Sequence, residues 1–206
     1  MSSTHRGSKR SAADYYPTPA WCVRLLLEEC DLPGSRWIEP CAGDGSIIRA
    51  VNDARPGILW SAMELRPECR ADLVEATGHP ARVTIGDSIE SPARCDVAIT
   101  NPPFRLALPF LRAWIGVPDR LAVLLRLNCL AGAARAEIMR HTAPDVYVLP
   151  NRPSFTGAGT DSIDYAWFVW SRDPRERGSL RVLRPLSRSE RQGSEDLAAR
   201  LYRGRQ

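Results

Sequence analysis

Residues 36–54 carry the sequence RWIEPCAGDGSIIRAVNDA, which is the segment most informative about the fold. The apolar run at its start predicts a strand over residues 36–39. Apolar residues at helical spacing near its end predict a helix over residues 46–54. The turn between them contains two glycines, which let the backbone bend sharply and approach a ligand closely. It has neither the glycine spacing of a dinucleotide-binding turn nor the lysine of a P-loop. Taken alone, it is also compatible with an ordinary strand-to-helix connection.

The same alternation of strand and helix continues on both sides of this stretch. Strands are expected at residues 36–39, 58–63, 82–85, 96–100, 120–127, 145–149 and 162–171. Helices are expected from Pro19 to the turn at residues 32–34, and at residues 46–54, 67–77, 106–115, 131–141 and 194–202. Strands that alternate with helices form βαβ units joined by right-handed crossovers. The sequence therefore predicts an α/β fold with a doubly wound, mostly parallel sheet, in a single domain over residues 15–171.

Acidic residues stand at the ends of the first three predicted strands, namely Glu39, Glu64 and Asp87. In such sheets, ligands bind beyond the carboxyl ends of the strands. An acid about 20 residues after the glycine turn can accept hydrogen bonds from ribose hydroxyls, and Glu64 has this spacing from Gly43. A single acid at a strand end is usually just solvated. Three on one edge predict a ligand that offers an amine, a ribose diol and an adenine amino group.

The fourth predicted strand is followed by NPPF at residues 101–104. The two prolines stiffen the backbone and remove two N–H donors. The Asn101 side-chain oxygen and the Pro102 carbonyl remain as acceptors, and Phe104 adds an apolar plate. This set is complementary to a planar amino group held beside an aromatic wall. Two prolines alone would indicate only a strand that ends there.

Together these segments resemble the S-adenosylmethionine-dependent, Rossmann-like amino-methyltransferases, in particular the DNA adenine-N6 methyltransferases of bacteriophage and prophage type. The resemblance covers about residues 15–170. It rests on YPTP at residues 16–19, EPCAGDG at 39–45 and NPPF at 101–104, in that order, and on a C-terminal hairpin from Arg152 to Trp170. It implies the class I methyltransferase fold, S-adenosyl-L-methionine as cofactor, and methyl transfer to the N6 amino group of adenine in DNA.

The resemblance also implies the site residues. The cofactor-binding set is Tyr16, Pro17, Thr18, Glu39, Pro40, Cys41, Ala42, Gly43, Asp44, Gly45, Glu64, Asp87 and Asn101. The catalytic set is Asn101, Pro102, Pro103 and Phe104. Similar quartets serve RNA adenine and protein glutamine in related families, so an RNA adenine-N6 methyltransferase is the alternative enzyme. A non-catalytic nucleic-acid-binding or decoy protein is the alternative from another class, although the intact Asn101 and acidic rim argue against it.

The basic charge of the chain lies at its two ends. Residues 1–14 hold three basic residues and one acid, and are expected to be a disordered tail. Residues 171–206 hold ten arginines and five acids, whereas residues 15–170 hold fifteen arginines and eighteen acids. A basic tail over residues 172–206 suits a polyanion, and DNA is the expected partner. Alternatively, Leu180, Val182, Leu183 and Leu186 form a last strand or packed segment.

Composition bounds the remaining possibilities. The 206 residues, 44% of them hydrophobic and 25% charged, suffice for one compact core. No apolar run approaches the roughly 20 residues that span a bilayer, and the N-terminus has no secretory h-region, so a cytoplasmic protein is expected. The six cysteines form no CxxC pair and the three histidines are isolated, so no metal site is expected. Cys41 has no histidine nearby in sequence and is interpreted as a small filler. Packing is the expected role of Trp167, Phe168 and Trp170.

Overall fold

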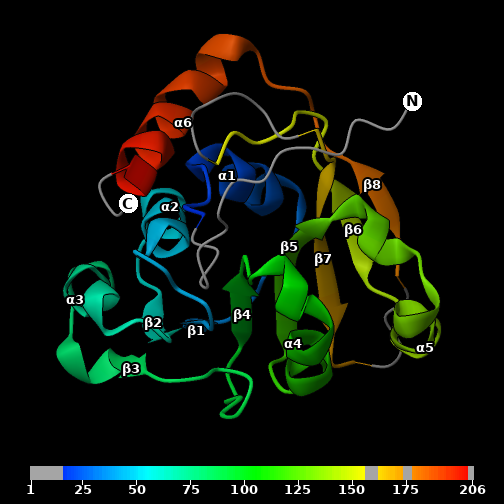
Figure 1. Cartoon of the computed structure of the whole chain (residues 1–206), viewed down its shortest axis with the longest axis horizontal. Coiled ribbons are helices and arrows are strands. Elements are labelled where there is room, and N and C mark those ends of the chain that lie inside the picture. Colours follow the sequence, from blue (N-terminus) through cyan, green and yellow to red (C-terminus); the bar gives the residue numbers. More distant parts are fainter. Residues whose placement is uncertain (1–15, 156–161, 174–177, 204–206) are drawn as a thin grey trace, which may run out of the picture.

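The computed structural model describes residues 16–155, 162–173 and 178–203 (Figure 1). Its strands are β1 (Arg36–Glu39), β2 (Leu59–Glu64), β3 (Val83–Ile85), β4 (Val97–Thr100), β5 (Arg120–Arg126), β6 (Asp145–Val148), β7 (Tyr165–Ser171) and β8 (Leu180–Val182). Its α-helices are α1 (Ala20–Glu29), α2 (Ser46–Ala54), α3 (Arg70–Thr77), α4 (Ala107–Trp114), α5 (Ala133–His141) and α6 (Arg188–Arg203). The disordered tail expected over residues 1–14 lies outside the described residues.

The eight strands form one sheet in the order β3-β2-β1-β4-β5-β7-β6-β8. Neighbouring strands are parallel except around β7, which runs antiparallel to both β5 and β6. The predicted α/β fold with a doubly wound, mostly parallel sheet is therefore confirmed. The strand order reverses between β1 and β4, and a crevice opens beyond the carboxyl ends of the strands at such a switch point.

Helices cover both faces of the sheet (Figure 1). On one face α1, α2 and α3 pack into a core that contains Trp21, Trp37 and Trp60. On the other face α4 and α5 pack over a second core around Trp114 and Phe168. Because both faces are covered, the central strands are apolar along almost their whole length and do not alternate. Every residue of β4 and the first six residues of β7 are buried.

The aromatic residues of β7 were expected to serve packing, and the structure confirms it. Trp167, Phe168 and Trp170 are at most 3% exposed. The indole nitrogen of Trp167 donates a hydrogen bond to the carbonyl of Cys22 at 2.8 Å, which links β7 to α1 across the core. A buried indole N–H needs such a partner, so this contact fixes the orientation of the ring.

The predicted elements up to β7 are all present, with shifts at their ends. β1 and α2 have the predicted bounds. β2 begins one residue later than predicted and includes Glu64, and β7 begins at Tyr165, three residues later than predicted. The helix expected at 67–77 begins with a 3₁₀ turn, Pro67–Cys69, because Pro67 opens it without an N–H donor. A 3₁₀ turn over Leu127–Leu130 delays the start of α5 to Ala133.

The segment after Ser171 is not a free arm where the structure describes it. β8 pairs with β6 in parallel, and Leu183 and Leu186 are buried, so the packed-segment interpretation is the one the structure supports. Helix α6 packs against α1 and buries Ala198 and Ala199 (Figure 1). Arginines of this segment are paired within the protein: Arg184, which precedes α6, contacts both Glu28 and Glu190, and Arg191 of α6 contacts Glu195.

The prediction of a helix over residues 194–202 was too short, because α6 begins at Arg188. Its start carries a capping box: the Glu190 carboxylate accepts the backbone N–H of Ser187 at 2.8 Å, and Ser187 Oγ accepts the N–H of Glu190 at 3.4 Å. These contacts and Arg184 lower the pKa of Glu190 to about 2. The polar first turns and Gly193 hide this start from an analysis based on apolar periodicity.

Three further observations concern membrane-spanning helices, thiols and metal ligands. Across the three described ranges, no helix has both the length and the apolar character needed to cross a membrane. All six cysteines are free thiols, and five of them are buried. Within the described part of the chain, no three His, Cys, Asp or Glu side chains are grouped to hold a metal ion.

Candidate active site

A cleft of about 960 Å³, part of it open to solvent, lies beyond the carboxyl ends of the strands near the switch point. Fourteen of the predicted site residues line it: Tyr16, Pro17, Thr18, Glu39, Pro40, Cys41, Ala42, Gly43, Asp44, Glu64, Asp87, Asn101, Pro102 and Pro103. Segments as distant in sequence as YPTP and NPPF therefore share one wall. Gly45 and Phe104 are the two predicted residues that do not line the cleft.

Asn101 is held from behind by Thr18. Its amide nitrogen donates to Thr18 Oγ1 at 3.1 Å, and the Thr18 side chain is buried. The amide nitrogen is engaged by Thr18, and the buried side-chain oxygen of Asn101 has no hydrogen-bond partner among the residues that the structure describes. Buried side-chain acceptors are nearly always paired in folded proteins, so a lone one in a cleft indicates a ligand that donates a hydrogen bond.

Two further buried acceptors belong to the turn after β1. One carboxylate oxygen of Glu39 and one of Asp44 are buried and lack partners. The other oxygen of Asp44 accepts the backbone N–H of Ser46 at 3.0 Å, which holds the start of α2. Burial raises the pKa of Glu39 well above its ordinary value, and the nearby negative charge of Asp44 raises it further. A cationic or multiply donating group in the cleft would relieve both effects.

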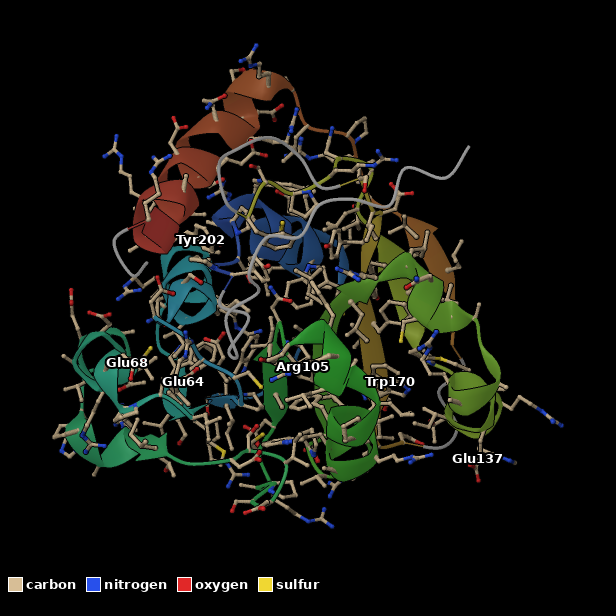
Figure 2. The ribbon with its side chains drawn as sticks, in the orientation of Figure 1. Glu64, Glu68, Arg105, Glu137, Trp170 and Tyr202 are labelled. Atoms are coloured by element: carbon tan, nitrogen blue, oxygen red, sulfur yellow. The ribbon has the colours of Figure 1, made fainter. Side chains whose placement is uncertain are left out.

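Glu64 ends β2 (Figure 2) and connects this strand to the glycine turn. One of its oxygens accepts the N–H of Gly43 at 2.8 Å. The other accepts the backbone N–H of Arg66 at 3.0 Å and its guanidinium Nε at 2.8 Å. A carboxylate offers about four acceptor sites, so Glu64 keeps capacity for a ligand hydroxyl while these contacts fix its position.

Asp87 lies on the exposed side of the cleft. Its Oδ1 accepts the N–H of Ile89 at 2.8 Å, a short loop contact that orients the carboxylate. The neighbouring Ser88 is buried, and its carbonyl accepts the indole N–H of Trp114 at 2.9 Å. The loop after β3 is thereby tied to α4, which fixes Asp87 at the rim of the cleft.

Gly45 does not line the cleft, and its role is to shape the turn before α2. It precedes α2 with φ of +83°, a conformation that residues with a side chain rarely adopt. A Cβ there would also lie 2.9 Å from the Cβ of Ala76 on α3. The turn therefore requires glycine at this position for its shape and for the close approach of α3.

Phe104 lies against an aromatic cluster. Its ring centroid is 5.5 Å from that of Tyr165, and Tyr165 in turn contacts Phe155 at 5.2 Å. The guanidinium carbon of Arg126 lies 4.7 Å from the centroid of Phe104. The ring of Phe104 therefore packs against aromatic neighbours, and the guanidinium of Arg126 covers part of it.

Cys41 has the environment of a packing residue. Its N–H donates to Thr100 Oγ1 at 3.3 Å, and its sulfur lies 3.7 Å from Ser88 Oγ. Burial raises the pKa of the Cys41 thiol to about 12, so it stays protonated at neutral pH. A protonated thiol is a poor nucleophile, in agreement with the interpretation as a filler.

Sequence analysis missed several residues at this site. Arg66 forms an ion pair with Glu64. It lies two residues after Glu64, the acid predicted to bind ribose, and this closeness in sequence could have identified it. Arg126 is the last residue of β5. The expectation that ligands bind beyond the carboxyl ends of the strands, which identified Glu39 and Glu64, would have identified Arg126 as well. Tyr202 gave no such signal; it lies on α6 (Figure 2). Its ring stacks on that of Tyr16, with centroids 5.9 Å apart and ring planes at 5°.

Comparisons with known proteins show the fold. No protein-family model and no curated protein sequence matches this chain. Among solved structures, a candidate RNA methyltransferase from Pyrococcus horikoshii is 20% identical, with a TM-score of 0.59 over 80% of this chain and 88% of that one. A candidate class I S-adenosylmethionine-dependent methyltransferase from Listeria monocytogenes is 10% identical, with a TM-score of 0.55 over 89% and 68%.

A third similar structure is the modification subunit of a candidate type I restriction enzyme from Vibrio vulnificus. It is 15% identical and has a TM-score of 0.58 over 95% of this chain, which spans 54% of that larger subunit. The fold is therefore that of the class I S-adenosylmethionine-dependent methyltransferases. At these identities the likeness concerns the fold alone.

The cleft fits S-adenosylmethionine, which is the cofactor of that class. The unpaired oxygens of Glu39 and Asp44 suit the ammonium group of its methionine part. Glu64 keeps acceptor capacity that ribose hydroxyls would use, and the Asp87 carboxylate in the same cleft would be available to an adenine amino group. The carboxylates of Glu39, Asp44 and Glu64 would repel a phosphate placed against them, although Arg66 and Arg105 also line the cleft.

Proposed function

We propose that this protein is an S-adenosylmethionine-dependent methyltransferase that methylates the exocyclic N6 amino group of adenine in DNA. The observation that carries the proposal is the buried, unpaired side-chain oxygen of Asn101, held in position by Thr18 on the wall of the cleft. An acceptor at this place, next to two prolines without N–H donors, suits an amino group better than a hydroxyl or carboxylate.

The chain contributes positioning and electrostatics. When bound, the cofactor would supply an activated methyl group on sulfur. Asn101 Oδ1 and the Pro102 carbonyl would each accept one N–H of the target amine. These two hydrogen bonds hold the nitrogen toward tetrahedral geometry and stabilise the positive charge that develops on it. Phe104 would stack on the base and keep its amine aimed along the line of transfer.

A base within a duplex cannot reach this cleft while it is stacked. Rotating it out of the helix costs a few kcal/mol, and the cost is smallest in single-stranded or mismatched DNA. RNA adenine is the second candidate substrate, because one of the similar structures is a candidate RNA methyltransferase. The unpaired acceptors of the cleft speak against a non-catalytic decoy, since a protein that binds no cofactor has no need of them.

The test is methyl transfer from labelled S-adenosylmethionine to separate pools of DNA, RNA and protein, followed by nucleoside analysis. We expect the label in N6-methyldeoxyadenosine. We also expect Asn101→Ala to lose nearly all transfer while its affinity for the cofactor, measured by calorimetry, changes little. Label found only in RNA or in protein, or full turnover by the Asn101 variant, would reject the proposal.

A further inference from the structure

The far end of β5 places a cation beside the catalytic segment. In the parallel pairing of β4 with β5, Val123 lies opposite Thr100. β5 continues three residues further, to Arg126, while the chain beyond Thr100 enters residues 101–104. Arg126 is therefore at the level of the NPPF segment, on the strand next to it. Its partner on the other side is Tyr165 of β7, which also contacts the ring of Phe104.

The guanidinium of Arg126 covers a face of the Phe104 ring on which an acceptor base would stack. Its central carbon is 4.7 Å from the centroid of Phe104, within the range of a cation–π contact. Phe104 does not line the open cleft, although its neighbours Pro103 and Arg105 do. A planar base and a planar guanidinium compete for the same kind of stacking contact, so a base that stacks on the covered side of Phe104 must displace Arg126.

Arg126 is also incompletely satisfied where it lies. Its Nε is buried and has no hydrogen-bond partner in the described part of the chain. Other arginines of this region are engaged: Arg135 donates to the carbonyls of Cys129 and Ala131, and Arg152 pairs with Asp164. An unpaired guanidinium N–H inside a protein is costly, and a planar guanidinium pairs best with an anion that can accept two hydrogen bonds.

We propose that Arg126 selects the acceptor: it covers Phe104 until a base enters, and then turns to bind a backbone phosphate beside that base. This inference rests on the proposed function and names its substrate class as a nucleotide within a polyanionic chain. A neutral side-chain amide or a free base would have to displace Arg126 and would bring no phosphate to receive it. The acids Glu39, Asp44 and Glu64 on the wall of the cleft would repel a phosphate placed against them.

The experiment pairs a change in the protein with a change in the substrate. The substrates are two single-stranded oligodeoxynucleotides with one adenine each. One carries ordinary phosphodiesters, and the other carries neutral methylphosphonates on both sides of the adenine. The proteins are the wild type, Arg126→Met and Arg126→Gln, with Arg112→Gln as the matched control. Arg112 is an exposed arginine of α4, so its loss removes one positive charge without touching Phe104.

For the wild type and the Arg112 control, we expect the methylphosphonate oligonucleotide to lose about tenfold in kcat/KM, as for one charge-assisted contact. For the Arg126 variants, we expect kcat/KM on the ordinary oligonucleotide to fall by a similar factor and the two oligonucleotides to become equivalent. Cofactor affinity should be unchanged, because Arg126 does not line the cleft. If Arg126→Met proves unstable in thermal melting, Arg126→Gln retains polarity and serves in the same comparison.

The inference is overturned if the methylphosphonate penalty is the same with and without Arg126, because the guanidinium would then not contact a flanking phosphate. It is also overturned if the Arg126 variants lose equally on both oligonucleotides, which indicates a structural role. If the wild type transfers no methyl group to DNA or RNA, the proposed function itself fails and this inference fails with it. An active wild type whose Arg126 variants keep the full kcat/KM on the ordinary oligonucleotide refutes this inference alone.

Discussion

Replacing Thr18 by valine tests whether the orientation of Asn101 matters for catalysis. The substitution keeps the shape of the buried side chain and removes the oxygen that accepts the Asn101 amide at 3.1 Å. The backbone N–H of Thr18 still donates to Ser46 Oγ, so the local main chain has no reason to move. The Asn101 nitrogen would be left as a buried donor without a partner, at a cost of about 1–3 kcal/mol.

That cost should appear mainly in the rate. If the Asn101 oxygen is aligned correctly only in the transition state, 1–3 kcal/mol corresponds to a fall of about 5- to 150-fold in kcat. Thr18→Ser is the matched control, because it keeps the hydroxyl and loses only a methyl group. The assay is single-turnover methyl transfer at saturating cofactor, with cofactor affinity by calorimetry and melting temperature measured for each variant. Equal rates for the valine and serine variants would refute the positioning role of Thr18.

Three other outcomes are expected. Glu39→Gln should raise the melting temperature, because burial raises the pKa of Glu39 in the folded protein. The stability associated with the protonated carboxyl is present below the pKa of Glu39 in the unfolded chain and is lost as the pH rises through its pKa in the folded protein, and a neutral glutamine avoids this loss. The gain should be larger at pH 8 than at pH 5, and cofactor affinity should fall; a gain independent of pH would contradict this. Asp87→Ala should weaken cofactor binding by about 1–3 kcal/mol with little change in kcat at saturation, and an unchanged dissociation constant by calorimetry would remove Asp87 from the site. Truncation after Ser171 should lower the melting temperature sharply, because it exposes the surfaces that cover Leu183 and Leu186; a truncated protein that melts like the full chain would be evidence against this packing.

Much of the fold could be predicted because its determinants are local. The apolar runs of the central strands, the glycines of the turn after β1 and the apolar spacing of α2 each lie within one element, and β1 and α2 have the predicted bounds. The rule that parallel strands direct their carboxyl ends to one edge then brings Glu39, Glu64 and Asn101 to one cleft. Their roles toward cofactor and substrate remain predictions.

Contacts between residues far apart in the chain could be found only in the folded structure. Asn101 and Thr18 are 83 positions apart, and no local pattern indicates that one holds the other. The cover that Arg126 places over Phe104 depends on the pairing of β4 with β5, which sequence periodicity does not specify. The C-terminal arginines suggested a free basic arm because composition records charge but not pairing, whereas in the fold Arg184 is shared between Glu28 and Glu190. A sequence determines which groups can donate, accept or pack, and the folded chain determines which of them remain unpaired and therefore available to a ligand.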